Sequence, residues 1–205
     1  MKILFLHGLA SSGAYKMATI LGQLVRNAEV IAPDLPPDPD EALAGIRAIC
    51  LQQSPDLIVG LSWGGFLALH LNVERPGWRQ RILVVNPDLH VSRLMRSMTG
   101  YKEYLSPRRG GEAGFHITPE LCDRYAQLEK APLAEGLVVG CFGLQDTLVN
   151  CSAEFESIYP GRCFRYEGGH LPNYPELKYR ILPIVEEHPD LLGFGPGEGV
   201  VLARR

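Results

Sequence analysis

A single serine lies between two glycines in the otherwise apolar stretch DLIVGLSWGGFLALHL, residues 56–71. Gly60, Ser62 and Gly64 form the pattern G-x-S-x-G, with the pattern of a buried strand before the serine and of a buried helix after it. So tight a turn strains the serine backbone, and neighbours without a Cβ relieve the clash. The spacing therefore predicts a nucleophile elbow, which presents the Ser62 hydroxyl beside the N–H groups of a helix N-terminus.

A serine hydroxyl is a weak nucleophile, so it needs a base, and the base needs an acid to orient it. When such groups belong to a parallel sheet, the chain order is serine, acid, histidine, and each residue follows a strand. Asp146 follows the apolar run at 137–142, and His170 follows the run at 163–166. We therefore predict Ser62 as the nucleophile, Asp146 as the acid and His170 as the base.

Other residues compete for two of these roles. Asp88 also follows a strand pattern, at 82–85, and stays open as an alternative acid. Glu167 is too close to His170 in sequence to orient its ring easily. The remaining candidate bases lie in helix or insertion contexts with no strand before them: His70, His90, His116 and His188.

The negative charge of a tetrahedral intermediate needs two N–H donors, an oxyanion hole. We expect one from the backbone of Trp63, the residue after the serine. The second is expected from the backbone of Leu9 in the loop HGLASSG, which Gly8 allows to turn back toward the serine. His7 is predicted to brace this loop through a side-chain hydrogen bond.

Short runs rich in Ile, Leu and Val recur along the chain, and a turn residue follows each. These runs are continuous rather than alternating, which is typical of strands buried on both faces. Helix-length segments at 14–27, 40–53 and 63–73 lie between them, so the pattern predicts an α/β domain with a parallel sheet and ligands at the carboxyl ends of its strands. The predicted strands cover residues 3–6, 30–32, 57–61, 82–85, 137–142 and 163–166.

About fifty residues separate the fourth and fifth predicted strands, which is too long for an ordinary connection. We expect an insertion or lid at 88–130, with helices near 90–98 and 119–130. It belongs to one domain, residues 1–188. The remaining residues, 189–205, form a Gly-rich tail whose pattern does not distinguish a loose end from a packed arm.

Composition narrows the function further. Of the 205 residues 46% are apolar, and the net charge of −3 is scattered without a basic stripe, so we expect no nucleic-acid partner. No apolar run approaches the roughly 18 residues of a membrane span, and the first run is too short for a signal peptide. The five cysteines include no C-x-x-C pair, which argues against disulfides and zinc. We therefore expect a cytoplasmic protein without a metal site.

Taken together, these motifs resemble the α/β-hydrolase superfamily, and within it the small YqiA-like esterases. The likeness spans roughly residues 2–185. It rests on LHGLASS, APDLPPDPDEAL, GLSWGGF, VVNPDLH with TGYKEY, HITPEL, LQDTLV and EGGH. It implies an α/β-hydrolase fold with a small sheet of six parallel strands, because the chain lacks the N-terminal hairpin of larger relatives.

The resemblance also implies a serine hydrolase that cleaves short-chain carboxylic esters or thioesters without a cofactor, and it points to the same Ser62, Asp146 and His170. The chain departs from the family pattern at Gln145 and Gly169, and at Trp63, which we expect to narrow the acyl pocket. Arg108 and Arg109 either attract an anionic leaving group or form a solvated basic loop. The alternative function is a hydrolase-fold binding or interaction module without catalytic activity.

Overall fold

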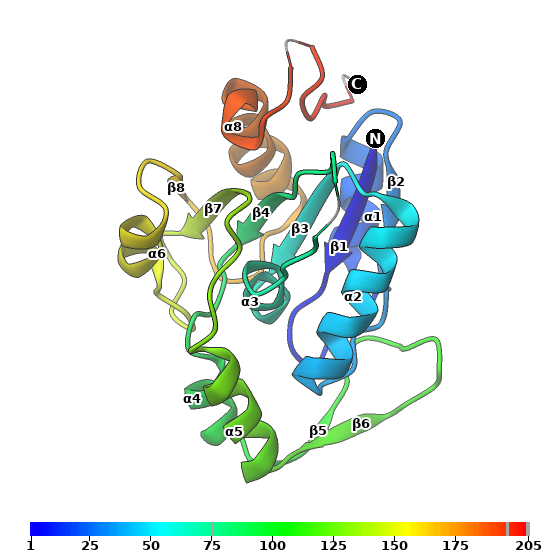
Figure 1. The fold of residues 1–205 in the computed structure, drawn as a ribbon, viewed down its shortest axis with the longest axis vertical. Helices are drawn as coiled ribbons and strands as arrows, with labels where there is room; N and C mark the ends of the chain where they lie inside the picture. The colour runs from blue at the N-terminus through cyan, green and yellow to red at the C-terminus, as the bar shows by residue number, and fades with distance from the viewer. Residues whose placement is uncertain (75, 196, 204–205) are drawn as a thin grey trace.

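A computed structural model describes residues 1–74, 76–195 and 197–203 of the chain. Its centre is a sheet formed by β1 (Lys2–Leu6), β2 (Glu29–Ile31), β3 (Leu57–Leu61), β4 (Arg81–Val85), β7 (Leu137–Gly143) and β8 (Cys163–Tyr166). The strand order is β2-β1-β3-β4-β7-β8, and every neighbouring pair is parallel (Figure 1). The predicted α/β class and the six-stranded parallel sheet are confirmed, and each strand lies within one residue of its predicted range.

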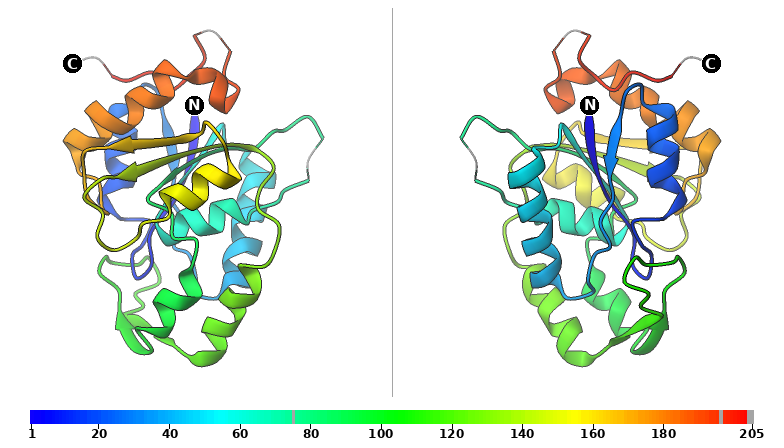
Figure 2. Two further views of the ribbon diagram at one scale, coloured as in Figure 1. Left: turned by 90° about the vertical axis from the view of Figure 1, so that its left-hand side faces the viewer. Right: turned by 90° about the vertical axis from the view of Figure 1, so that its right-hand side faces the viewer.

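Helices cover both faces of this sheet, which explains why its strands read as continuous apolar runs (Figure 2). One face carries α2 (Pro39–Gln53), α3 (Trp63–Leu69) and α6 (Ser152–Ile158). The other carries α1 (Lys16–Leu24) and a continuous helical run made of α7 (Tyr174–Glu176), η1 (Leu177–Ile181) and α8 (Leu182–Glu187). The sequence reading missed α6 and this last run.

The helix starts follow from local sequence. The Asp38 side chain caps α2 by accepting from the N–H groups of Asp40 and Glu41, at 3.0 and 3.2 Å, and Pro39 occupies the first turn. This is the role of the breaker run DLPPDPD, which separates β2 from α2. Ser54 ends the helix in the left-handed conformation, and β3 begins three residues later.

The insertion between β4 and β7 contains α4 (Val91–Arg96), β5 (Gly100–Glu103), β6 (Gly114–Ile117) and α5 (Pro119–Leu128). The strands β5 and β6 form an antiparallel hairpin that the sequence reading did not predict. Figure 1 shows the insertion beyond the carboxyl ends of the central strands, at the opposite end of the molecule from α8. It therefore covers the edge of the sheet at which a ligand is expected.

The loop of this hairpin is fastened to the loop between β1 and α1. The Leu105 N–H donates to the Ala10 carbonyl at 2.8 Å. The Arg108 guanidinium donates to the carbonyls of Leu35 and Ser11, at 3.2 and 3.4 Å, and lies over the Tyr104 ring at 4.2 Å. The insertion is thus joined directly to the loops that follow β1 and β2 at the expected site.

The C-terminal segment packs as an extended arm over the described part of its length. After the short helix η2 (Pro189–Leu192), the side chains of Leu192, Phe194 and Val200 are buried in the core around α1 and α8. The Arg26 N–H donates to the Val201 carbonyl at 2.8 Å, beside a bridge between Val25 and Leu202. The arm therefore ties the turn after α1 to the helical face behind the sheet.

Candidate active site

The elbow around Ser62 joins β3 to α3. Ser62 has a φ of +53°, a left-handed conformation that is costly for a residue with a side chain, and its N–H donates to the Val85 carbonyl at 2.9 Å. A Cβ on Gly64 would collide with the carbonyl oxygens at the end of β1, and one on Gly60 would collide with the backbone of α3. The glycines are therefore needed for close approach of backbones, which holds the strained serine in place.

Three predicted side chains form one hydrogen-bonded chain. Ser62 Oγ lies 2.9 Å from His170 Nε2, and His170 Nδ1 lies 2.7 Å from Asp146 Oδ2. The other oxygen of Asp146 accepts from the N–H groups of Leu148 and Val149, at 2.9 and 3.0 Å. A carboxylate with these partners accepts the Nδ1 proton, which leaves Nε2 free to accept a proton from the serine.

The loops that carry the acid and the base are joined to each other. Leu144 and Gln145 extend the pairing of β7 and β8 beyond the strands, because their N–H groups donate to the carbonyls of Tyr166 and Gly168 at 2.9 Å. A Cβ on Gly143 would lie 2.5 Å from the Gly168 carbonyl oxygen. Only a glycine at the end of β7 permits this close approach, which holds the two loops together.

Asn86, at the end of β4, connects both loops through one buried amide. Its Oδ1 accepts from the Gly143 N–H at 2.7 Å. Its Nδ2 lies within hydrogen-bond distance of the Tyr166 hydroxyl and of the Gly169 and His170 carbonyls, at 2.9, 2.9 and 2.8 Å. Its φ is +46°, which asparagine tolerates better than most residues. The sequence reading assigned no role to this residue.

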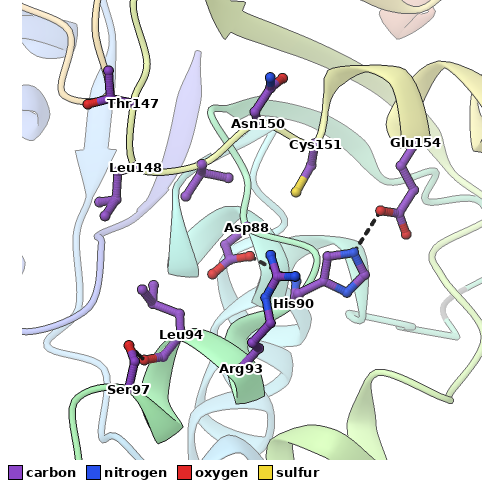
Figure 3. Close-up of a pocket in the computed structure, with 11 residues that line it drawn as sticks. Asp88, His90, Arg93, Leu94, Ser97, Thr147, Leu148, Asn150, Cys151 and Glu154 are labelled. Atoms are coloured by element: carbon purple, nitrogen blue, oxygen red, sulfur yellow. Dashed lines mark hydrogen bonds and ion pairs between the residues drawn. The ribbon is translucent and has the colours of Figure 1, made fainter.

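Asp88 is separate from the hydrogen-bonded chain. Its Oδ1 accepts from the His90 N–H at 2.8 Å, and burial raises the pKa of its carboxyl (Figure 3). Glu167 pairs with Gln145 instead of with His170. His70 packs in the core on the Phe66 ring, and His90 pairs with Glu154. The described structure therefore gives His170 one carboxylate partner, Asp146.

The two expected oxyanion donors lie close to the serine. Trp63 is the first residue of α3, so its N–H has no acceptor within the helix. In the described residues the Leu9 N–H donates to no other group. An added Cβ on Gly8 would lie 3.8 Å from the Ser62 Cβ, which places this loop directly beside the nucleophile.

His7 braces the loop as predicted. Its Nδ1 lies 2.8 Å from the Gly8 carbonyl, and its Nε2 accepts from the Leu35 N–H at 3.0 Å. Only the neutral ring can donate at Nδ1 and accept at Nε2. Burial lowers the pKa of His7 to about 4, so the ring keeps both bonds at neutral pH.

An apolar cavity of about 520 Å³ opens at the serine. Ser62 and His170 are among the residues that line it, and the insertion supplies much of its wall. We call it the apolar cavity. Its apolar side chains include Leu94, Met98, Tyr101, Leu105, Phe115, Ile117, Leu148 and Leu171.

For the Arg108 side chain neither of the two alternatives holds, and one expectation about this cavity is wrong. The Trp63 side chain does not narrow it: the ring is buried in the core, and its Nε1 donates to the Tyr125 hydroxyl at 2.8 Å. Arg108 is not an available anion-binding group, because its side chain is only 6% exposed and is held by backbone carbonyls and by Glu112. The backbone of Arg109, in turn, donates to Asp34.

Metal ligands, membrane-spanning helices and cysteines are three further features of the structure. Among the described residues, no group of three or more histidine, cysteine or acidic side chains is arranged to hold a metal ion. No helix in that part of the chain is long and apolar enough to cross a membrane. All five cysteines are free, and four of them are buried.

This sheet with its elbow has the α/β-hydrolase fold. Among solved structures, the chain is similar to a monoacylglycerol lipase from Paleococcus ferrophilus (17% identity, 93% of this chain, 94% of that chain, TM-score 0.62). It is also similar to mouse alpha/beta hydrolase domain-containing protein 10 (15% identity, 93% of this chain, 88% of that chain, TM-score 0.60). A third similar structure is the type II thioesterase BorB from the borrelidin biosynthetic cluster (16% identity, 93% of this chain, 90% of that chain, TM-score 0.54). At these identities the likeness shows the fold.

The family follows from the sequence. Residues 2–110, just over half of the chain, match the uncharacterised protein family UPF0227, so the chain belongs to this family. The predicted resemblance to the YqiA-like family is confirmed. No curated protein matches the chain significantly. The matched segment contains Ser62 and ends before Asp146 and His170.

Proposed function

We propose that this protein is a serine hydrolase that cleaves carboxylic esters or thioesters of short acyl groups through an acyl-enzyme. The observation that supports this best is the pair of hydrogen bonds joining Ser62, His170 and Asp146, at 2.9 and 2.7 Å. An apolar cavity beginning at the same serine suits an acyl chain. The fold is shared with enzymes named as lipases and thioesterases.

In the first half of the reaction, His170 Nε2 removes the proton from Ser62 as Oγ attacks the carbonyl carbon. The charge that develops on the carbonyl oxygen is stabilised by the N–H groups of Leu9 and Trp63. As the tetrahedral intermediate collapses, the imidazolium returns its proton to the leaving alcohol or thiol. The acyl group remains on Ser62.

In the second half, His170 takes a proton from water, and the resulting nucleophile attacks the acyl-enzyme. The same donors stabilise the second tetrahedral intermediate, and the acid leaves as Ser62 recovers its proton. Asp146 keeps the imidazole in the required tautomer and stabilises its charged form throughout. This mechanism uses no metal or cofactor.

A fluorophosphonate probe combined with peptide mass spectrometry tests this proposal. We expect phosphonylation of Ser62 in the wild-type protein and turnover of p-nitrophenyl acetate. Ser62→Ala should remove both, whereas Ser157→Ala, a substitution in the exposed helix α6, should remove neither. A folded wild-type protein that is neither labelled nor active would contradict the proposal and would favour a binding module.

The acid has its own comparison, Asp146→Asn against Asp88→Asn. Losing the orienting acid of such a triad commonly lowers kcat by about 10⁴-fold. We expect Asp146→Asn to reduce kcat for p-nitrophenyl acetate at least about 100-fold more than Asp88→Asn does. A larger loss in Asp88→Asn would assign the role to Asp88 instead.

A further inference from the structure

A second cavity of about 570 Å³ lies beside the apolar cavity, and we call it the polar cavity. Two side chains line both cavities, Leu94 of α4 and Leu148 of the loop after β7. Leu148 is fixed close to the proposed acid, because its N–H donates to Asp146 Oδ1 at 2.9 Å. The polar cavity therefore begins directly behind the apolar wall of the proposed active site.

The lining of the polar cavity is rich in hydrogen-bonding groups (Figure 3). Asp88 is 5% exposed, and in the described residues only one of its carboxylate oxygens has a hydrogen-bond donor, the His90 N–H. The His90 ring pairs with Glu154 at 2.8 Å. Hydroxyl and amide groups complete the wall: Ser97, Thr147 and Asn150.

Arg93 is the cation of this lining. Among the described residues, its guanidinium has no carboxylate within 4.0 Å, unlike Arg96 on the same helix, which pairs with Asp123 at 2.6 Å. The cavity thus presents an acceptor on Asp88 that lacks a second donor, and donors on Arg93 that lack a charged acceptor.

We propose that the polar cavity binds the alcohol portion of the ester substrate, and that this portion is a polyol of about the size of a monosaccharide. Hydroxyl groups can donate to Asp88 and accept from Arg93 at the same time. The two carboxylates, Asp88 and Glu154, disfavour an anionic group, and Arg93 disfavours a cationic one. This inference rests on the proposed ester hydrolysis.

The two cavities also match the two halves of such an ester. Acyl and alcohol portions extend in different directions from the carbonyl carbon, which must lie at Ser62. The apolar cavity would hold the acyl chain, and the alcohol portion would pass Leu148 to reach Asp88 and Arg93. In an amphiphilic ester, the apolar acyl chain would then lie in the apolar cavity and the polar alcohol portion in the polar cavity.

A matched pair of esters tests the inference, 6-O-butanoylglucose and cyclohexylmethyl butanoate, which differ in the hydroxyl groups and the ring oxygen of a six-membered ring. We expect the wild-type protein to prefer the glucose ester in kcat/KM. Arg93→Gln and Asp88→Asn should each lower this preference about tenfold, the usual size of a lost hydrogen bond to a charged group. Arg96→Gln, the same substitution three residues along the helix, should leave the preference unchanged.

Binding of methyl glucoside, followed by saturation-transfer NMR, separates this inference from the proposed function, because it needs no turnover. We expect a signal with wild-type protein and with Ser62→Ala, and its loss in Arg93→Gln. A protein that hydrolyses the cyclohexylmethyl ester but neither prefers the glucose ester nor binds the glucoside would overturn the polyol site alone. A preference equal in wild type, Arg93→Gln and Arg96→Gln would overturn it as well.

Discussion

Asn86 illustrates how one side chain can set the relative position of an acid and a base. Its amide accepts from the end of β7 and donates to the loop after β8, so it spans the two elements that carry Asp146 and His170. Among the described residues its side chain hydrogen-bonds only to backbone groups and to Tyr166, which makes it a positioning residue rather than a catalytic one. Its loss should therefore affect the reaction more than substrate binding.

We predict that Asn86→Gly lowers kcat for p-nitrophenyl acetate by about tenfold to a hundredfold while KM changes little, since small misplacements of reacting groups have costs of this size. Glycine adopts the left-handed φ without strain, so the substitution removes mainly the hydrogen bonds. Asn27→Gly is the matched control, because Asn27 is exposed and has a φ of +54°. Equal kcat values in the two variants would show that Asn86 does not position the site.

A residue could be predicted as part of the site from the sequence when its immediate neighbours indicate its role. Ser62 follows from the glycines around it, and Asp146 and His170 follow from their places after strands. Asn86 could not be found in this way, because its partners lie 57 to 84 residues away and no local pattern marks a bridging amide. Trp63 was misjudged because its backbone lies at the site while its ring points into the core.

At the scale of elements, the elbow depends on backbone-to-backbone packing between β1, β3 and α3. The strained φ of Ser62 is maintained because α3 approaches the ends of both strands without intervening side chains. Of the two glycines that flank Ser62, Gly64 has the closer approach to another backbone segment. The geometry of the nucleophile is therefore coupled to the stability of the whole layer.

Gly64→Ala should lower the free energy of unfolding by about 3 kcal/mol or more, or prevent folding, because the new Cβ would overlap the carbonyl oxygens of Leu6 and His7. Gly45→Ala is the control in the exposed part of α2, where nothing lies within 4 Å of the new Cβ. It should raise stability by roughly 0.5–1 kcal/mol. Urea unfolding measures both, and similar effects of the two substitutions would refute the packing explanation.

Long elements were easier to anticipate than short ones. The central strands carry continuous apolar runs, and the starts of α2 and α5 are marked by a capping residue followed by proline. The hairpin of β5 and β6 was missed because each strand has four residues and much of its surface is exposed. Its place depends on contacts with two distant loops, at Ala10 and at Leu35, which sequence patterns do not reveal.

For the molecule as a whole, the buried neutral His7 links folding to pH. Its pKa is about 4 in the folded protein, against about 6.5 in an unfolded chain. Between these values the unfolded chain binds a proton that the folded protein does not. The contribution of His7 to the free energy of unfolding is therefore fully present above pH 6.5 and is lost as the pH falls toward 4.

We expect the free energy of unfolding to fall by about 2 to 3 kcal/mol more in the wild-type protein than in His7→Gln when the pH is lowered from 7 to 4.5. Glutamine keeps a donor and an acceptor but carries no titrating group, so the difference isolates His7 from other acidic-range groups. Urea unfolding at the two pH values provides the measurement. A parallel loss in both proteins, or an NMR titration of the His7 ring near pH 6.5, would contradict the assignment.

The strand order also has a consequence for refolding kinetics. The serine belongs to β3, whereas its two partners arrive with β7 and β8, which extend the sheet on the far side of β4. A refolding chain could not regain the proposed ester hydrolysis until this last pair has docked, however early the first four strands assemble. The rate at which turnover recovers would therefore report when the sheet is complete. The fluorescence of Trp63, whose ring hydrogen-bonds to Tyr125, would report a different event, the packing of α3 on α5.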